Sequence, residues 1–145
     1  MSQKLLVVDD EKSITRIIGR IAESLDYEVF EVNDPADALD TFTRVQPDVL
    51  MLDMIMPDID GVDILRQVAA MGTTTRIVVM SGFGSGYLRL AKAVAAFEDQ
   101  PAIIELAKPF RRSGVIAVLD CARPVPPLPA ATPGMTHAAP AWVAA

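Results

Sequence analysis

The stretch from Val49 to Gly61 reads VLMLDMIMPDIDG, and it decides the fold. It begins with four apolar residues, Val49–Leu52, and Asp53 follows them directly. A short apolar run that is bounded by turn residues is typical of a strand buried on both faces of a parallel sheet. Open α/β folds keep their sites at the carboxyl edge of such a sheet. Asp53 is therefore predicted to lie at a functional site.

Strand-like and helix-like segments alternate around this stretch. Further apolar runs typical of strands lie at Leu5–Val8, Tyr27–Val32, Arg76–Met80 and Ala102–Ala107. After each strand, apolar residues recur at helical spacing. The first helix is expected to have its N-cap at Ser13, the second to start at Asp34-Pro35, and the third to end at Gly72. The fourth and fifth helices are expected at Tyr87–Phe97 and Ser113–Cys121. The alternation predicts an α/β fold: a three-layer, doubly wound (βα)5 sandwich around a parallel five-stranded sheet of the common order 2-1-3-4-5.

Composition limits the class of protein. The chain has 145 residues, enough for one domain with a substantial core, and its formal net charge of -6 argues against direct binding of nucleic acid. The single cysteine, Cys121, excludes an intrachain disulfide, and no apolar run approaches membrane-spanning length. We therefore expect a cytoplasmic protein without membrane insertion, with one domain over residues 3–121. The rest, 122–145, is rich in proline and alanine and predicts a flexible tail.

Polar side chains follow four of the predicted strands. Asp9 and Asp10 come after the first strand and Asp53 ends the third, while Ser81 and Lys108 follow the fourth and fifth. These four strands are neighbours in the expected order, so their terminal side chains should meet at one edge of the sheet. Three carboxylates at close range repel one another, and Mg²⁺ is the kind of hard cation that removes this cost.

Such a cluster suits chemistry on a phosphoryl group. With its charge compensated, Asp53 can act as a nucleophile, while Ser81 and Lys108 hold two phosphoryl oxygens. Each residue taken alone has a plainer explanation: a helix N-terminus for the acidic pair, a cap for the serine, a surface charge for the lysine. Their joint occurrence at separate strand ends favours an aspartyl-phosphate site.

These motifs resemble those of response-regulator receiver domains (CheY-like) of two-component signalling, over about residues 3–121. The matching segments are Asp9-Asp10, Asp53–Gly61, Ser81-Gly82 and Lys108-Pro109-Phe110. The resemblance implies that Asp53 accepts a phosphoryl group from a sensor histidine kinase or phosphotransfer protein, with Ser81 as the hydroxyl switch and Lys108 as the phosphate partner. It also implies Mg²⁺ (or Mn²⁺) bound by Asp10, Asp53 and the Ile55 carbonyl, with Asp9 acting through water. The peptide bond between Lys108 and Pro109 is expected to be cis.

The sequence departs from this family pattern at two places. Receivers commonly carry a Tyr or Phe three residues before the lysine, and here Glu105 takes that position. An acid does not fill an apolar pocket cheaply, so either Glu105 stays outside as part of a partner surface, which we favour, or other side chains carry the conformational change. The spacing from Ser81 to Lys108 is also long for the family, which predicts an enlarged region around Gly82–Pro101 and an unusual partner or dimer mode.

Three functions are compatible with these residues. The first is a stand-alone receiver that signals through protein partners. A homodimer formed by its fourth helix, fifth strand and fifth helix is compatible with this function. The reactions expected are only its own phosphorylation and slow dephosphorylation at Asp53. The second is a phosphorylation-independent interaction module in which Glu105 marks a modified switch. The third, a phosphohydrolase, needs an acid two residues after the nucleophile, where Ile55 cannot transfer protons. No output domain is expected in residues 122–145, so we favour the first.

Overall fold

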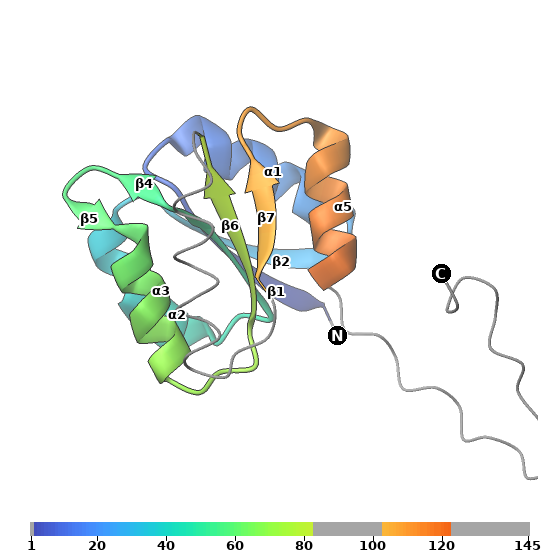
Figure 1. Cartoon of the computed structure of the whole chain (residues 1–145). Coiled ribbons are helices and arrows are strands. Elements are labelled where there is room, and N and C mark those ends of the chain that lie inside the picture. Colours follow the sequence, from blue (N-terminus) through green and yellow to red (C-terminus); the bar gives the residue numbers. More distant parts are fainter. Residues whose placement is uncertain (1, 83–102, 123–145) are drawn as a thin grey trace, which may run out of the picture.

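Five parallel strands form the central sheet of the protein, as seen in a computed structural model that describes residues 2–82 and 103–122 (Figure 1). The order is β2-β1-β3-β6-β7. The strands are β1 (Gln3–Val8), β2 (Tyr27–Val32), β3 (Val49–Asp53), β6 (Arg76–Ser81) and β7 (Ile104–Ala107). The helices are α1 (Lys12–Ser24), the 3₁₀ turn η1 (Pro35–Asp37), α2 (Ala38–Val45), α3 (Gly61–Ala70) and α5 (Arg112–Ala122). The predicted α/β fold and the order 2-1-3-4-5 of its sheet are confirmed.

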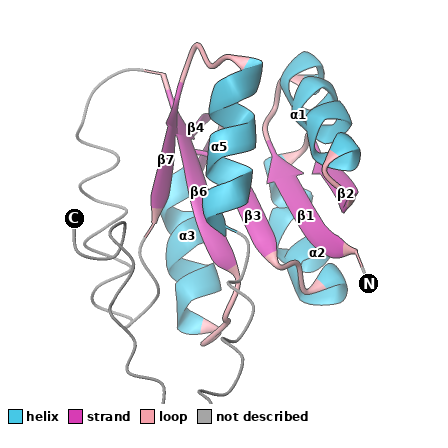
Figure 2. Ribbon diagram, turned by 90° about the vertical axis from the view of Figure 1, so that its right-hand side faces the viewer, coloured by secondary structure: helices cyan, strands magenta, loops and turns pink. Residues whose placement is uncertain are grey.

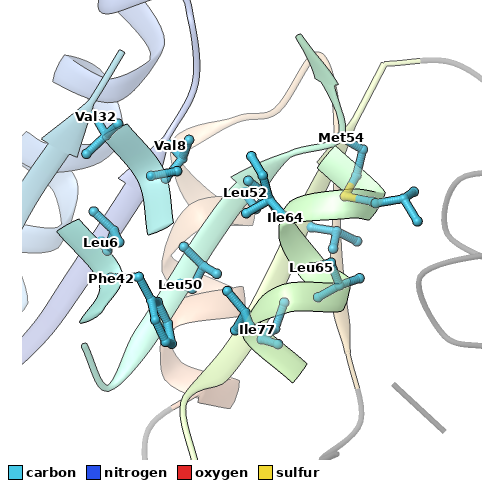
Figure 3. Packing of buried hydrophobic residues seen from close by; sticks show 14 of the residues in the cluster. Leu6, Val8, Val32, Phe42, Leu50, Leu52, Met54, Ile64, Leu65 and Ile77 are labelled. Carbon is cyan, nitrogen blue, oxygen red and sulfur yellow. The ribbon is translucent and has the colours of Figure 1, made fainter. Parts of the chain in front are cut away.

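The sheet separates two apolar cores because successive residues of a strand point to opposite faces. In β3, Leu50 and Leu52 pack in the core shared with α2 and α3, whereas Val49 and Met51 pack in the core shared with α1 and α5. Figure 2 shows the helices on both sides of the sheet, and Figure 3 shows the packing of the first core. All five residues of β3 are buried, as the apolar run predicts.

Two local features differ from the sequence-based expectations. Ser13 is not the N-cap of the first helix: α1 begins at Lys12, with Glu11 in the cap position. The reason is that the Asp9 carboxylate accepts a hydrogen bond from the Glu11 amide at 3.0 Å, which sets the turn before the helix. In addition, β4 (Ile55–Met56) and β5 (Ile59–Asp60) form a small antiparallel hairpin that the sequence analysis does not predict.

Other predicted boundaries agree with the structure. Asp34 caps the turn η1 through a bond from the Ala36 amide at 3.0 Å, and Gly72 ends α3 with a φ of 66°. The peptide bond between Lys108 and Pro109 is cis. The predicted fourth helix and the tail after Ala122 lie outside the described residues. No helix in the described part of the chain is both long and apolar enough to cross a membrane.

Candidate functional site

The carboxyl edge of the sheet brings three carboxylates together. Asp9 and Asp10 follow β1, and Asp53 ends the neighbouring strand β3. One oxygen from each carboxylate lies within 4.8 Å of the others. Asp9 and Asp53 are buried, whereas Asp10 is exposed. The convergence predicted from the strand order is therefore observed.

Lys108 lies between the two buried carboxylates. Its Nζ donates to Asp9 Oδ2 at 2.8 Å and to Asp53 Oδ2 at 3.2 Å. Its backbone amide donates to the Ser81 carbonyl at 2.9 Å, which fixes the end of β7 against the end of β6. One ammonium thus compensates two carboxylates that would otherwise be buried without a counter-charge.

Burial and neighbouring charges shift the pKa values of Asp53 and Lys108. Loss of hydration raises the pKa of Asp53 from 3.8 to about 6; the Asp9 charge also raises it, while the Ile55 amide and Lys108 act in the opposite direction. The pKa of Lys108 is raised, because its hydrogen bond to Asp9 and the charge of Asp53 outweigh the effect of burial. At neutral pH, Asp53 is therefore mostly the carboxylate, the form that can act as a nucleophile.

The chain after Asp53 turns sharply away from the sheet. The Ile55 amide donates to Asp53 Oδ1 at 3.1 Å, and the Met54 amide donates to the Met80 carbonyl at 3.0 Å. At the end of this loop the backbone of Gly61 packs directly against that of Met54, since a Cβ on Gly61 would lie 2.6 Å from Met54 Cα. Only glycine fits this contact between backbones. The loop therefore holds Asp53 at the edge of the sheet, with one carboxylate oxygen bonded to the Ile55 amide.

A partly buried polar side chain outside the predicted site supports the acidic pair. Asn33 follows β2, and its Nδ2 donates to the Asp9 carbonyl at 2.9 Å and to Thr15 Oγ1 at 2.9 Å. The Asp9 amide donates to the Val32 carbonyl at 3.1 Å, so both backbone groups of Asp9 are held by the end of β2. The sequence analysis missed Asn33; its signal was a lone amide directly after an apolar strand, next to the edge that carries the acids.

Ser81 and Glu105 contact each other beside the cluster. Ser81 is buried at the end of β6, and its hydroxyl donates to Glu105 Oε1 at 3.3 Å. Glu105 is exposed on β7, in agreement with the favoured interpretation that it stays outside, but that interpretation did not foresee its contact with Ser81. Asp58 is exposed in the loop, and Asp60 accepts from the Val62 amide at 2.9 Å as the N-cap of α3.

The three carboxylates form a donor set that suits a hard divalent cation. Mg²⁺ prefers one or two carboxylates together with water and phosphate oxygens. Asp10 is exposed and so leaves room for water beside the buried pair. The residues present therefore fit the Mg²⁺ ion that the sequence analysis expects.

An apolar groove opens next to this edge. It has a volume of about 520 Å³ and is lined by residues of α1 and of the segment after β7. Ile17 is half exposed in it, and Lys108 belongs to both the groove and the carboxylate cluster. The described residues that line it are Ile14, Ile17, Ile21, Gly82, Lys108, Pro109, Phe110 and Arg112.

Comparisons with known proteins agree with this geometry. Sporulation initiation phosphotransferase F of Bacillus subtilis is 28% identical over 110 residues, which cover 76% of this chain and 85% of that protein. Response regulator MprA of Mycobacterium tuberculosis is 32% identical over 117 residues, which cover 81% of this chain and 49% of that protein. The chain thus spans about half the length of the MprA proteins that it matches.

Solved structures and a family model complete the comparison. The structure of chemotaxis response regulator CheY4 of Vibrio cholerae superposes with a TM-score of 0.74 at 25% identity, covering 85% of this chain and 100% of that one. The receiver domain of a response regulator from Bermanella marisrubri gives a TM-score of 0.69 at 25% identity, over 84% of this chain and 98% of that one. The model of the response regulator receiver domain matches residues 5–120. The chain therefore belongs to the response regulator receiver domain family of two-component systems.

Proposed function

We propose that the protein accepts a phosphoryl group on Asp53 from a phosphohistidine of a sensor histidine kinase or phosphotransfer protein. The observation that carries this proposal is the meeting of Asp9, Asp10, Asp53 and Lys108 at one edge of the sheet. The phosphorylated protein would signal through protein partners in the cytoplasm. A homodimer through the face of β7 and α5 is part of the same proposal; the fourth helix expected there lies outside the described residues.

The transfer itself needs one nucleophile and no base from this chain. A carboxylate oxygen of Asp53 attacks the phosphorus, and the bond from phosphorus to the donor imidazole nitrogen breaks. The bonding electrons stay on the imidazole nitrogen, which takes up a proton from water. The product is an aspartyl phosphate, and the chain is not expected to turn over other substrates.

The neighbouring side chains stabilise the oxygens of the phosphoryl group. The Lys108 ammonium, 3.2 Å from Asp53 Oδ2, would move to a phosphoryl oxygen, and the Ser81 hydroxyl would donate to another. Asp10, Asp53 and the Ile55 carbonyl would bind Mg²⁺ (or Mn²⁺), with Asp9 acting through water. The metal, when bound, compensates negative charge on the carboxylates and on the phosphoryl oxygens.

The donor protein is proposed to cover the apolar groove. Asp53 lies at the carboxyl edge of the sheet, and Lys108 joins that edge to the groove. Ile17 and Phe110 would then contact the donor, since exposed apolar surface of this kind marks sites of protein contact.

The experiment that tests the proposal measures phosphorylation directly. The protein with Mg²⁺ is incubated with acetyl phosphate, and separately with phosphorylated donor proteins, and the intact mass is recorded. Wild type and Asp58→Asn should gain one phosphoryl group, because Asp58 is an exposed loop acid. Asp53→Asn should gain none. Equal labelling of Asp53→Asn and wild type would overturn the proposal.

A further inference from the structure

We propose that Glu105 is a positioning residue that holds the Ser81 hydroxyl in the unphosphorylated protein and competes with the phosphoryl group for it. The inference rests on the proposed function and adds to it a role for a residue that departs from the family pattern. Its starting point is the hydrogen bond of 3.3 Å from Ser81 Oγ to Glu105 Oε1.

The sheet places these two side chains together. β6 and β7 are parallel neighbours, and Ser81 pairs with Ala107. Glu105 lies two residues before Ala107, so its side chain points to the same face of the sheet as that of Ser81. Asp53 pairs with Met80, the residue before Ser81. Ser81 is therefore one residue beyond the position of β6 that pairs with Asp53, the residue that would carry the phosphoryl group.

A hydroxyl can donate only one hydrogen bond at a time, and this decides the competition. An ionised Glu105 only accepts hydrogen bonds, and the oxygens of an aspartyl phosphate dianion likewise only accept them. Ser81 therefore cannot donate to both. Among the described residues, the Ser81 hydroxyl donates to Glu105 and not to Asp53. Donation from Ser81 to a phosphoryl oxygen then requires that the bond to Glu105 breaks.

Ser81 and Glu105 differ in how far they are buried, and this decides which side chain is released when the bond breaks. Ser81 is 5% exposed and is held by the strand, whereas Glu105 is exposed. When Ser81 turns to the phosphoryl group, the Glu105 carboxylate is released at the surface, and the negative phosphoryl group repels it. The same exchange would thus change the surface of β7 without an aromatic side chain.

Beryllofluoride, a mimic of the phosphoryl group, tests this competition by its affinity in the presence of Mg²⁺. Glu105→Ala should bind beryllofluoride about three- to tenfold more tightly than wild type, since one competing hydrogen bond to a charged group is removed. Glu105→Gln keeps an acceptor oxygen and should give less than half of the change in binding free energy seen with alanine. In a Ser81→Ala background, the effect of Glu105→Ala should disappear.

Two controls separate this role from general effects of charge and folding. Asp58→Asn removes the charge of another exposed acid, one in the loop after Asp53, and it should leave the affinity unchanged. Mg²⁺ affinity without beryllofluoride should be the same in wild type and Glu105→Ala. The inference is wrong if Glu105→Ala leaves the affinity for beryllofluoride unchanged, if glutamine acts like alanine, or if the effect persists without the Ser81 hydroxyl. Failure of wild type to bind beryllofluoride with Mg²⁺ would instead overturn the proposed function.

Discussion

Lys108 Nζ lies 2.8 Å from Asp9 Oδ2 and 3.2 Å from Asp53 Oδ2, so a single cation holds two buried carboxylates from neighbouring strands. The ends of β1, β3 and β7 are thereby joined by charge as well as by the sheet. This ammonium compensates the two buried carboxylates when no metal is bound, and it lies next to the expected position of a phosphoryl group.

Removing this cation should destabilise the metal-free protein. Lys108→Ala leaves Asp9 and Asp53 buried without compensation, and the free energy of unfolding should fall by about 2–4 kcal/mol. Added Mg²⁺ should restore more stability to this variant than to wild type. Chemical denaturation with and without Mg²⁺ measures both effects. Lys12→Ala, at an exposed position of α1, is the matched control and should change neither. An unchanged stability of Lys108→Ala would contradict the role assigned to the ion pair.

The raised pKa of Asp53 predicts a dependence of stability on pH in the metal-free protein. The pKa is about 6 in the folded state and 3.8 as the reference value, so the folded state binds more protons between these two values. The contribution of Asp53 is therefore fully present below pH 4 and is lost as the pH rises through about 6, by on the order of 1–3 kcal/mol. Denaturation curves of wild type and Asp53→Asn from pH 4 to 8 measure the difference. A difference that stays constant with pH would show that the pKa is not raised.

Asn33 should influence metal binding without contacting the metal. Asn33→Ala releases the Asp9 carbonyl and Thr15, so the acidic pair is held less firmly, and Mg²⁺ affinity should fall by about tenfold. Isothermal titration with Mg²⁺ measures this. Thr43→Ala, which removes an exposed hydroxyl that bonds to Leu39, serves as the control with unchanged affinity. Wild-type affinity in Asn33→Ala would exclude a positioning role.

Two glycines should respond to alanine in opposite ways. Gly61→Ala places a Cβ 2.6 Å from Met54 Cα, so the backbone after Asp53 must shift, at a cost of about 1–3 kcal/mol in stability. Among the described residues, a Cβ at Gly114 in α5 would meet Leu106 Cδ1 alone, at 3.4 Å, so Gly114→Ala should stabilise by up to about 1 kcal/mol through helix propensity. Thermal unfolding of both variants compares them. Equal effects would show that the short contact of Gly61 is relieved without cost.

The groove next to the site should matter only for a protein donor. Ile17→Lys introduces a charge into the apolar surface and should slow phosphotransfer from a phosphorylated donor by about tenfold, which corresponds to about 1.4 kcal/mol. Labelling by acetyl phosphate should be unchanged. Met71→Lys, an equally exposed apolar residue at the end of α3, is the control for charge. A slower reaction with both donors would place the effect of Ile17 in the site itself rather than in docking.

The buried strands and the charged residues at their ends could be predicted from local sequence. The apolar run Val49–Leu52 can be buried on both faces only in the centre of a sheet, and the alternation with helical segments makes that sheet parallel. Asp9, Asp53 and Lys108 then converge because the carboxyl ends of parallel strands share one edge. Ser13 was wrong as an N-cap, since the Asp9 side chain, two residues before Glu11, determines where the helix begins.

The sequence by itself determined the order of elements, the buried strands and the edge at which the charged residues meet, because these depend on periodicity and on strand ends. Only the tertiary structure decided the partners of single side chains. Asn33 bonds to Asp9 across 24 positions, and Ser81 bonds to Glu105 across 24 positions. Such contacts depend on the register between strands and on side-chain direction, and neither leaves a periodic signal in the chain.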